Sequence, residues 1–260
     1  MCTFIILQGV HPDLPVVVAA TRDEFYARRT TGPQVLAPGI VGGRDEEKGG
    51  TWLGVTAGGL FVGLTNQRSG GRVDRTRRTR GEIVLAALRS GSPGGVRRLL
   101  AGLDGQAYNG FNLLFGDATG MAVAYGRPGQ RDIAVDTITD GLHVLPNDRL
   151  DADDWPKVHR ARDLVAPQLG APWSELSRWL GRVLGDHVRP PLDEVPPPPP
   201  DSPLSRELLR ELAALCIHTE VYGTRSGSIT ALVPIGVAHY LVADGPPCVT
   251  PFVDHTALLR

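Results

Sequence analysis

The chain has 260 residues and a formal net charge of −1, with 42% hydrophobic and 21% charged residues, as is ordinary for a globular protein. The near-zero charge gives no global field that would favour nucleic acid or an anionic membrane surface. No apolar run reaches the ~20 residues of a membrane span, and the first residues lack the basic and apolar regions of a secretory signal, so we expect a cytoplasmic protein.

The first predicted unit is a hairpin at the start of the chain. Residues 3–9 and 15–20 contain short continuous apolar runs typical of strands buried on both faces, and Pro12 and Asp13 mark a turn between them. If the strands pair about a centre near Pro12, position i faces roughly position 24 − i. Cys2 then lies opposite Arg22, so strand pairing alone brings residues 21–24 to the thiol.

The later elements alternate between groups of strands and groups of helices. Patterns and turn signals predict strands at 51–56, 60–65, 110–116, 121–125, 133–135, 142–145, 217–222, 228–233 and 237–242, and helices at 81–89, after Ser92, and at 155–169, 173–184 and 204–215. Strands that return after helices usually rejoin an existing sheet. We therefore expect an α+β fold with two antiparallel sheets stacked face to face and covered by helices.

The whole chain, 1–260, is predicted to form a single domain. Residues 189–203 contain five consecutive prolines, Pro196 to Pro200, which suit neither a sheet interior nor a helix. We expect this stretch to be an extended surface loop within that domain.

Cys2 carries the sharpest chemical hypothesis, because it directly follows the initiator methionine. Removal of Met1 would place a thiol and a free α-amine on one residue. Their reference pKa values are about 8.5 and about 8, so one residue could supply both the nucleophile and the general base. The alternative is that Cys2 is a small buried apolar residue at a strand start, which is the common situation of a free cysteine.

Several short segments, in order along most of the chain, together resemble one known family. They are Met1-Cys2-Thr3, Arg22-Asp23-Glu24-Phe25-Tyr26, Gly42-Gly43-Arg44-Asp45, Gly49-Gly50-Thr51-Trp52-Leu53-Gly54, Leu64-Thr65-Asn66, Gly110-Phe111-Asn112-Leu113-Leu114, Trp155-Pro156-Lys157-Val158 and Tyr222-Gly223-Thr224-Arg225-Ser226. The set resembles the family named for its Asn-Arg-Asp-Glu signature (NRDE), which includes transport and Golgi organisation protein 2. The chain departs from the signature at Thr21, where the family has Asn, so we assign no catalytic role to this side chain.

The NRDE family in turn resembles N-terminal nucleophile (Ntn) hydrolases of the bile-salt and penicillin acylase type. That resemblance implies a four-layer αββα sandwich and a nucleophilic cysteine supported by arginine, aspartate and asparagine side chains. Carried over by position, the implied catalytic residues are Cys2 as the nucleophile, Arg22 and Asp23 as its supports, Asn66 and Asn112 as oxyanion or amine contacts, and Arg225 as a late arginine.

These roles are chemically reasonable, and each has a structural alternative. A guanidinium beside the thiol would favour the thiolate and lower its pKa, while a carboxylate could orient the α-amine. An asparagine N–H could stabilise a tetrahedral oxyanion. However, Arg22 and Asp23 could equally form a structural ion pair, Asn66 a turn, and Arg225 part of a hairpin. Asn112 is less expected within a strand.

An arginine-rich segment at 72–80 could form an anion clamp at the pocket mouth. The candidate substrate-binding set is Trp52 with Arg68, Arg75 and Arg78, for phosphates of coenzyme A or propionates of a porphyrin. The alternative is a solvated charged segment. Three widely spaced cysteines make no disulfide framework, and seven scattered histidines show no zinc spacing. We therefore expect no metal site and no required cofactor.

Two functions from different classes remain open. The first is a cysteine Ntn amidohydrolase or acyltransferase that acts on an amide or thioester of a small acyl substrate. The second is a non-catalytic trafficking protein of the same fold that binds haem, lipid or acyl-CoA, as the association of eukaryotic relatives with haem and lipid homeostasis implies. Fold alone does not separate them, and the oligomeric state is not predicted.

Overall fold

The computed structural model describes residues 2–67, 73–198 and 204–260. The predicted substrate contact Arg68, the neighbouring Arg72 and the end of the proline run at 199–203 lie outside the described residues. Residues 189–198 contain a short 3-10 helix, Leu192–Glu194, and no strand. No helix in these described ranges is both long and apolar enough to cross a membrane.

The described strands form two antiparallel sheets. The first has the order β10-β1-β2-β11-β12-β13 and the second the order β3-β4-β5-β6-β7-β8-β9. The strands of the first sheet are β1 (Thr3–Gln8), β2 (Val16–Phe25), β10 (Gly141–Leu145), β11 (Tyr222–Val233), β12 (Gly236–Ala243) and β13 (Val253–Asp254). Those of the second are β3 (Thr30–Ala37), β4 (Ile40–Asp45), β5 (Leu53–Thr56), β6 (Phe61–Asn66), β7 (Phe111–Asp117), β8 (Gly120–Gly126) and β9 (Ala134–Thr137).

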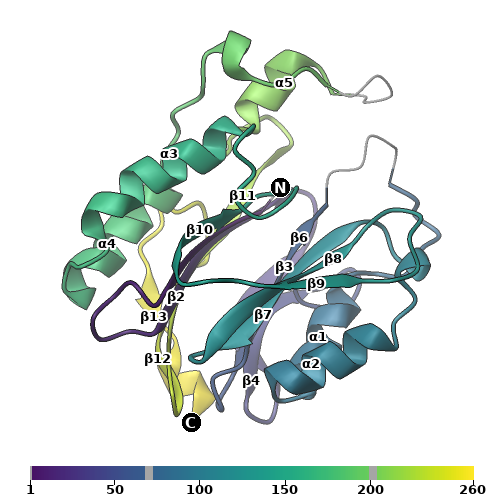
Figure 1. The fold of residues 1–260 in the computed structure, drawn as a ribbon. Helices are drawn as coiled ribbons and strands as arrows, with labels where there is room; N and C mark the ends of the chain where they lie inside the picture. Colours follow the sequence, from purple (N-terminus) through teal and green to yellow (C-terminus); the bar gives the residue numbers. More distant parts are fainter. Residues whose placement is uncertain (1, 68–72, 199–203) are drawn as a thin grey trace.

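Helices cover the outer face of each sheet, which gives the four αββα layers seen in Figure 1. Helices α1 (Gly81–Arg89) and α2 (Pro93–Ala101) pack on the second sheet, while α3 (Pro156–Val165) and α4 (Trp173–Leu184) pack on the first. The short helix α5 (Arg206–Glu211) precedes β11. The predicted helix starts at Gly81, at the Ser92 cap and at Trp173 are confirmed.

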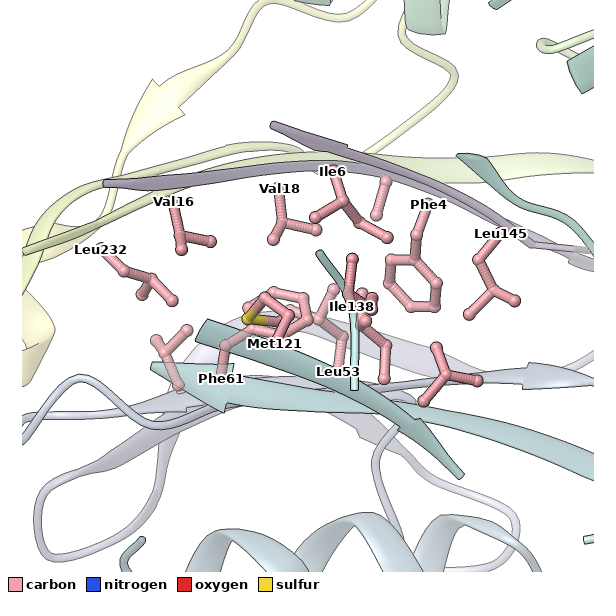
Figure 2. Close-up of a cluster of buried hydrophobic side chains, with 14 of the residues drawn as sticks. Phe4, Ile6, Val16, Val18, Leu53, Phe61, Met121, Ile138, Leu145 and Leu232 are labelled. Carbon is pink, nitrogen blue, oxygen red and sulfur yellow. The ribbon is translucent and has the colours of Figure 1, made fainter. Parts of the chain in front are cut away.

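The four central residues of β1, Phe4 to Leu7, are all apolar because both faces of this strand are buried. Its side chains alternate between the two faces of the sheet, so Phe4 and Ile6 enter the core between the sheets, whereas Ile5 and Leu7 pack under α3 and α4. Figure 2 shows Phe4 and Ile6 facing residues of the opposite sheet.

Phe4, near the start of the chain, packs between the two sheets. It is 1% exposed, and its ring lies edge-on to Phe61 with centroids 6.1 Å apart. We expect Phe4→Ala to lower the free energy of unfolding by about 3–5 kcal/mol, since it leaves a cavity between packed sheets. Chemical denaturation measures this. Phe25→Ala, at a side chain 55% exposed, is the control; equal losses in both variants would contradict the packing described.

The predicted register of the first hairpin is confirmed. Thr3 pairs with Thr21 and Phe4 with Ala20, so the pairs sum to 24 as expected. On the other side of β2, strand β11 pairs Thr224 with Asp23 and Ser226 with Arg22. A register shift between these pairs leaves Arg225 outside the ladder. Arg22 and Asp23 therefore lie within the sheet, next to the start of β1.

Other local features differ from the predictions. No strand is predicted at β3, where Gly32 and Pro33 interrupt the pattern. β3 is an edge strand, the position where a proline costs no ladder bond. The predicted strand 217–222 is largely a turn, closed by hydrogen bonds between Thr219 and the carbonyl oxygen of Tyr222. The predicted helix 204–215 is limited to α5, since residues 212–214 form turns.

Candidate active site

Cys2 lies where two cavities meet just before β1. Arg22, Trp52 and Leu64 line both cavities together with Cys2. The first cavity, of about 90 Å³, is bordered by charged side chains: Asp23, Glu24, Arg28, Asp45 and Arg80. The second is a narrow gap between the sheets with largely apolar walls: Phe4, Ala20, Leu53, Tyr240 and Val242. The thiol therefore faces a charged space on one side and an apolar space on the other.

Arg22, which lines both cavities with Cys2, lies over an aromatic ring. Its guanidinium carbon lies 4.2 Å from the centre of the Trp52 ring, and its Nη2 is 3.9 Å from Glu24 Oε2. The Arg22 side chain is only 6% exposed. Its Nη1 is buried and has no hydrogen-bond partner among the described residues. A buried cationic donor of this kind is available to a ligand oxygen.

Asp23 is buried in the sheet and anchored from β11. The hydroxyl of Thr224 donates to Asp23 Oδ1 over 2.6 Å, and Thr224 Oγ1 in turn accepts from the backbone N–H of Ile217 over 2.8 Å. Burial raises the pKa of the Asp23 carboxyl, while positive charge nearby, the Thr224 hydrogen bond and Arg22 act in the opposite direction. One positive charge that acts on Asp23 is Lys157, a buried residue in the first turn of α3.

The thiol of Cys2 differs in one respect from the expectation. Burial raises its pKa above the ordinary value, and the opposing effects of Arg22 and of a backbone hydrogen bond from Asp23 do not compensate. Arg22 lowers the pKa of the thiol, in the direction predicted, but desolvation of the thiolate is the larger effect in the chain that carries Met1.

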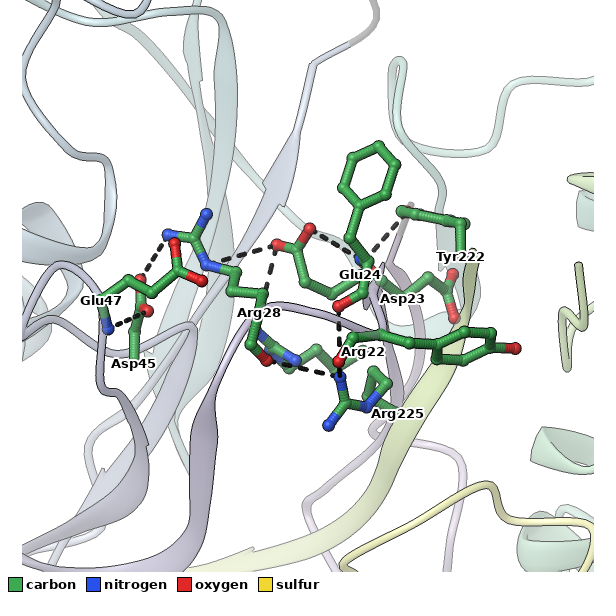
Figure 3. A network of polar contacts seen from close by, with 10 residues as sticks. Arg22, Asp23, Glu24, Arg28, Asp45, Glu47, Tyr222 and Arg225 are labelled. Carbon is green, nitrogen blue, oxygen red and sulfur yellow. Dashed lines mark hydrogen bonds and ion pairs between the residues drawn. The ribbon is translucent and has the colours of Figure 1, made fainter. Parts of the chain in front are cut away.

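A network of ion pairs forms the floor of the charged cavity (Figure 3). Arg28 Nη2 pairs with Asp45 Oδ2 over 2.5 Å, and Arg28 Nε lies 3.7 Å from Glu24 Oε2. Asp45 Oδ1 also accepts from the backbone N–H of Glu47 over 3.1 Å. These contacts join the end of β2 to the end of β4 and fix the carboxylates near Arg22.

Arg225, the predicted late arginine, contacts the turn that follows β2. Its Nη1 donates to the carbonyl oxygens of Phe25 and Tyr26 over 3.2 Å and 2.8 Å. It does not line either cavity at Cys2. Its described contacts are those of a clamp on the turn that follows β2, so a direct catalytic role stays a prediction.

The two predicted asparagines occupy different environments. Asn66 ends β6 and lines the charged cavity, and its carbonyl oxygen accepts from Asn147 Nδ2 over 2.7 Å. Asn112 is fully buried in β7, and its Nδ2 donates to the carbonyl oxygen of Asp148 over 2.7 Å and to Thr65 Oγ1 over 3.1 Å. The contacts of Asn112 anchor the loop after β10, outside the residues that line the two cavities.

Of the predicted substrate-binding set, Trp52 lies at the site and the described arginines do not. Arg75 is exposed, and Arg78 pairs with Glu82 over 2.6 Å while remaining 64% exposed. Arg80, from the same arginine-rich segment, does line the charged cavity and donates to the carbonyl oxygen of Gly110 over 3.0 Å. The structure thus brings a different arginine to the cavity from those selected by sequence.

Sequence reasoning brought Glu24 to the thiol without giving it a role, and it did not select Arg28, Asp45 or Lys157. The quoted Gly42-Gly43-Arg44-Asp45 segment contained the signal. A Cβ placed on Gly43 would lie 2.3 Å from the Trp52 ring, so only glycine lets this ring lie against β4 and support Arg22. Asp45, two residues later, binds Arg28.

The family model described as Transport and Golgi organisation 2 matches residues 1–240. The chain belongs to this family. It is 31% identical over 234 residues to the Transport and Golgi organization protein 2 homolog of Homo sapiens, covering 82% of this chain and 80% of that protein. It is 30% identical over 232 residues to the homolog of Bos taurus, with the same two coverages.

Solved structures give a weaker likeness. A C2A mutant of conjugated bile acid hydrolase from Clostridium perfringens has a TM-score of 0.49 at 13% identity, covering 98% of this chain and 96% of that one. Penicillin V acylase from Agrobacterium tumefaciens has a TM-score of 0.47 at 12% identity, covering 98% of this chain and 86% of that one. A likeness at this level carries nothing about chemistry.

Proposed function

We propose that this chain is a cysteine-dependent N-terminal nucleophile hydrolase or acyltransferase that acts on an amide or thioester of a small acyl substrate. The main support for the proposal is the position of Cys2 between a charged and an apolar cavity. Pairing of β1 with β2 places Arg22 and Asp23 next to it. The NRDE resemblance implies the same nucleophile.

In the proposed reaction, removal of Met1 first frees the α-amine of Cys2. The amine takes the thiol proton, and the sulfur attacks the carbonyl carbon of the substrate to form a tetrahedral oxyanion. The oxyanion collapses as the bond to the leaving amine or thiol breaks, and the leaving group takes the proton from the α-ammonium. Water, deprotonated by the same amine, then attacks the thioester on Cys2, releases the acid and restores the thiol.

The neighbouring residues have distinct parts in this proposal. Asp23 orients the α-amine, and the free Nη1 of Arg22 donates to the substrate oxygen that gains negative charge. The apolar gap beside Phe4 and Leu53, of about 20 Å³, would have to widen to admit the acyl chain, while the leaving group lies in the charged cavity. The charged cavity, of about 90 Å³, is well below the roughly 300–1,000 Å³ of ligand pockets for drug-sized molecules, which supports a small substrate.

The experiment that tests this function uses protein that begins at Cys2. It is incubated with N-acyl amides and acyl thioesters of graded chain length, and both product release and the mass of the protein are followed. We expect turnover of short acyl compounds through an adduct on Cys2. Saturable binding without turnover or adduct, unchanged in Cys2→Ser, would contradict the enzyme and favour the carrier of lipid or acyl-CoA.

Haem binding stays a separate prediction of the carrier hypothesis. A Soret band that saturates on titration with haemin and is unaffected by Cys2→Ser would support it. Apart from Cys2, no cysteine or histidine among the described residues lines either cavity at the thiol, although Tyr240 lines the apolar one.

Thr224 provides a test of the part played by Asp23. The Thr224 hydrogen bond lowers the pKa of Asp23 against the raising effect of burial. Thr224→Val removes this opposition, so the pKa of Asp23 rises further and a larger fraction of the carboxyl is protonated at acidic pH. We therefore expect the acid limb of the kcat/KM profile to move to higher pH.

The matched control is Thr230→Val on the same strand, β11. Thr230 is fully buried, and its hydroxyl oxygen has no hydrogen-bond partner among the described residues, so its loss leaves the site unchanged. An acid limb that moves to lower pH, or moves equally in both variants, would contradict the role of Asp23.

A further inference from the structure

Four side chains with metal-binding atoms meet at the end of α4, at a place separate from the cavities at Cys2. They are His187, Cys216, His218 and Cys248, and their ligand atoms all lie within 4.8 Å of one another. None of the four lines either cavity at Cys2. The sequence concealed this cluster because its members come from three separate segments and show no short metal-binding repeat.

Two distances within the cluster, both from His218, match those of a tetrahedral metal centre. His218 Nε2 lies 3.6 Å from Cys216 Sγ and 3.4 Å from Cys248 Sγ. In a zinc site with Zn–S of about 2.3 Å and Zn–N of about 2.0 Å, tetrahedral geometry separates sulfur and nitrogen ligands by about 3.5 Å. Two thiolates and two imidazoles form the Cys₂His₂ donor set of closed zinc sites.

The surroundings also orient the ligands. His187 Nδ1 lies 3.1 Å from the carbonyl oxygen of Cys216, so donation of a proton from Nδ1 leaves Nε2 for a metal. The backbone N–H of Cys216 donates to the carbonyl oxygen of Asp186 over 2.9 Å, which fixes the two segments side by side. A bidentate contact from Arg160 to Asp186, at 2.9 Å and 3.0 Å, holds this segment on α3.

Cys248 reaches the cluster through a close contact between backbones. It lies in a turn closed by hydrogen bonds from Val249 and Thr250 to the carbonyl oxygen of Pro246. A Cβ on Gly185 would lie 3.1 Å from the Cys248 Cα, so glycine at the end of α4 allows this approach. Both histidines are exposed, which gives a metal ion a path from solvent.

We propose that His187, Cys216, His218 and Cys248 form a structural binding site for one zinc ion. Four protein ligands would complete the tetrahedral coordination, so the site would hold the ion without an open position for chemistry. Binding would displace the protons of both thiols.

The site would support the structure next to Cys2. Ile217 lies between two of the ligands, and its backbone N–H donates to Thr224 Oγ1 over 2.8 Å. The hydroxyl of Thr224 in turn donates to Asp23 over 2.6 Å. A metal ion that fixes residues 216 and 218 would therefore fix Ile217 between them, and with it the hydrogen bond that holds Thr224 against Asp23.

The test is titration of the fully reduced, metal-free chain with Co²⁺ and then Zn²⁺. We expect one equivalent of Co²⁺ to give a thiolate-to-cobalt charge-transfer band and the intense visible bands of tetrahedral cobalt, and Zn²⁺ to remove both. Mass spectrometry for metals on protein reloaded with zinc should give one zinc per chain. These readouts need no variant and do not depend on acyl-transfer activity, so their outcome is separate from that of the proposed function.

Variants then locate the ion. Loss of a group that only hydrogen-bonds to a metal ligand costs about 10–100-fold in metal affinity. We therefore expect a larger loss from Cys248→Ser, which removes a ligand, and from the double variant that adds Cys216→Ser. His159→Asn, at an exposed histidine outside the cluster, and Cys2→Ser should retain wild-type affinity. Absence of a thiolate–cobalt band after reduction, or equal affinity in the double variant, would overturn the site. A Cys216–Cys248 disulfide that binds no metal once reduced would also overturn it.

Discussion

Replacing Cys2 by serine should remove the acyl adduct and lower kcat/KM by at least about 10³-fold. The reason is chemical: an amine of pKa about 8 can deprotonate a thiol of pKa about 8.5, whereas a serine hydroxyl is far less acidic. Burial raises the pKa of the thiol further, so its proton is harder for the amine to remove. Steady-state kinetics with the best acyl substrate, together with intact mass, measures both effects.

The same variant should leave the fold intact. Cys2 precedes β1 and is only partly buried, and the hairpin pairing begins at Thr3. We expect a free energy of unfolding within about 0.5 kcal/mol of the wild-type value, the usual range for changes outside the packed core. Retention of more than a tenth of the activity in a folded Cys2→Ser chain would exclude Cys2 as the nucleophile.

Blocking the α-amine of Cys2 should cause the second largest loss of activity. In a protein with a residue ahead of Cys2 that is not removed, the nitrogen is an amide and cannot accept a proton. General base catalysis contributes about 10²–10⁴-fold, so we expect a loss of that size with Cys2 itself unchanged. The thiol, whose pKa is raised by desolvation when Met1 is present, should then remain protonated at neutral pH.

One preparation serves as its own control for this prediction. A chain with an N-terminal extension that a protease removes immediately before Cys2 is assayed before and after cleavage. Activity should appear in proportion to the fraction of chains that begin at Cys2, as counted by intact mass. Equal activity before and after cleavage would show that the free amine has no part in the reaction.

The part of the site formed by local pairing was predictable from the sequence. Two apolar runs and a turn near Pro12 fixed the register, and the register placed Arg22 and Asp23 beside the start of β1. Such pairing depends on residues close in sequence, and a one-residue slip would turn every buried side chain to the wrong face.

The rest depended on contacts between distant segments. Thr224 meets Asp23 only because β11, about 200 residues later, joins β2 in the first sheet. Gly32 and Pro33 interrupt the strand pattern of the edge strand β3, so this strand was not predicted. No spacing rule indicates that Arg80 lines the cavity while Arg78 pairs with Glu82. The cluster around Cys216 likewise exists only in the folded chain.

The most direct test of the central claim is mass spectrometry of protein that begins at Cys2, quenched in acid during turnover of an acyl thioester. The account predicts one acyl group per chain, on the N-terminal peptide, attached to sulfur and released by hydroxylamine. Turnover without that adduct, or an acyl group on another residue that forms at the rate of turnover, would contradict it.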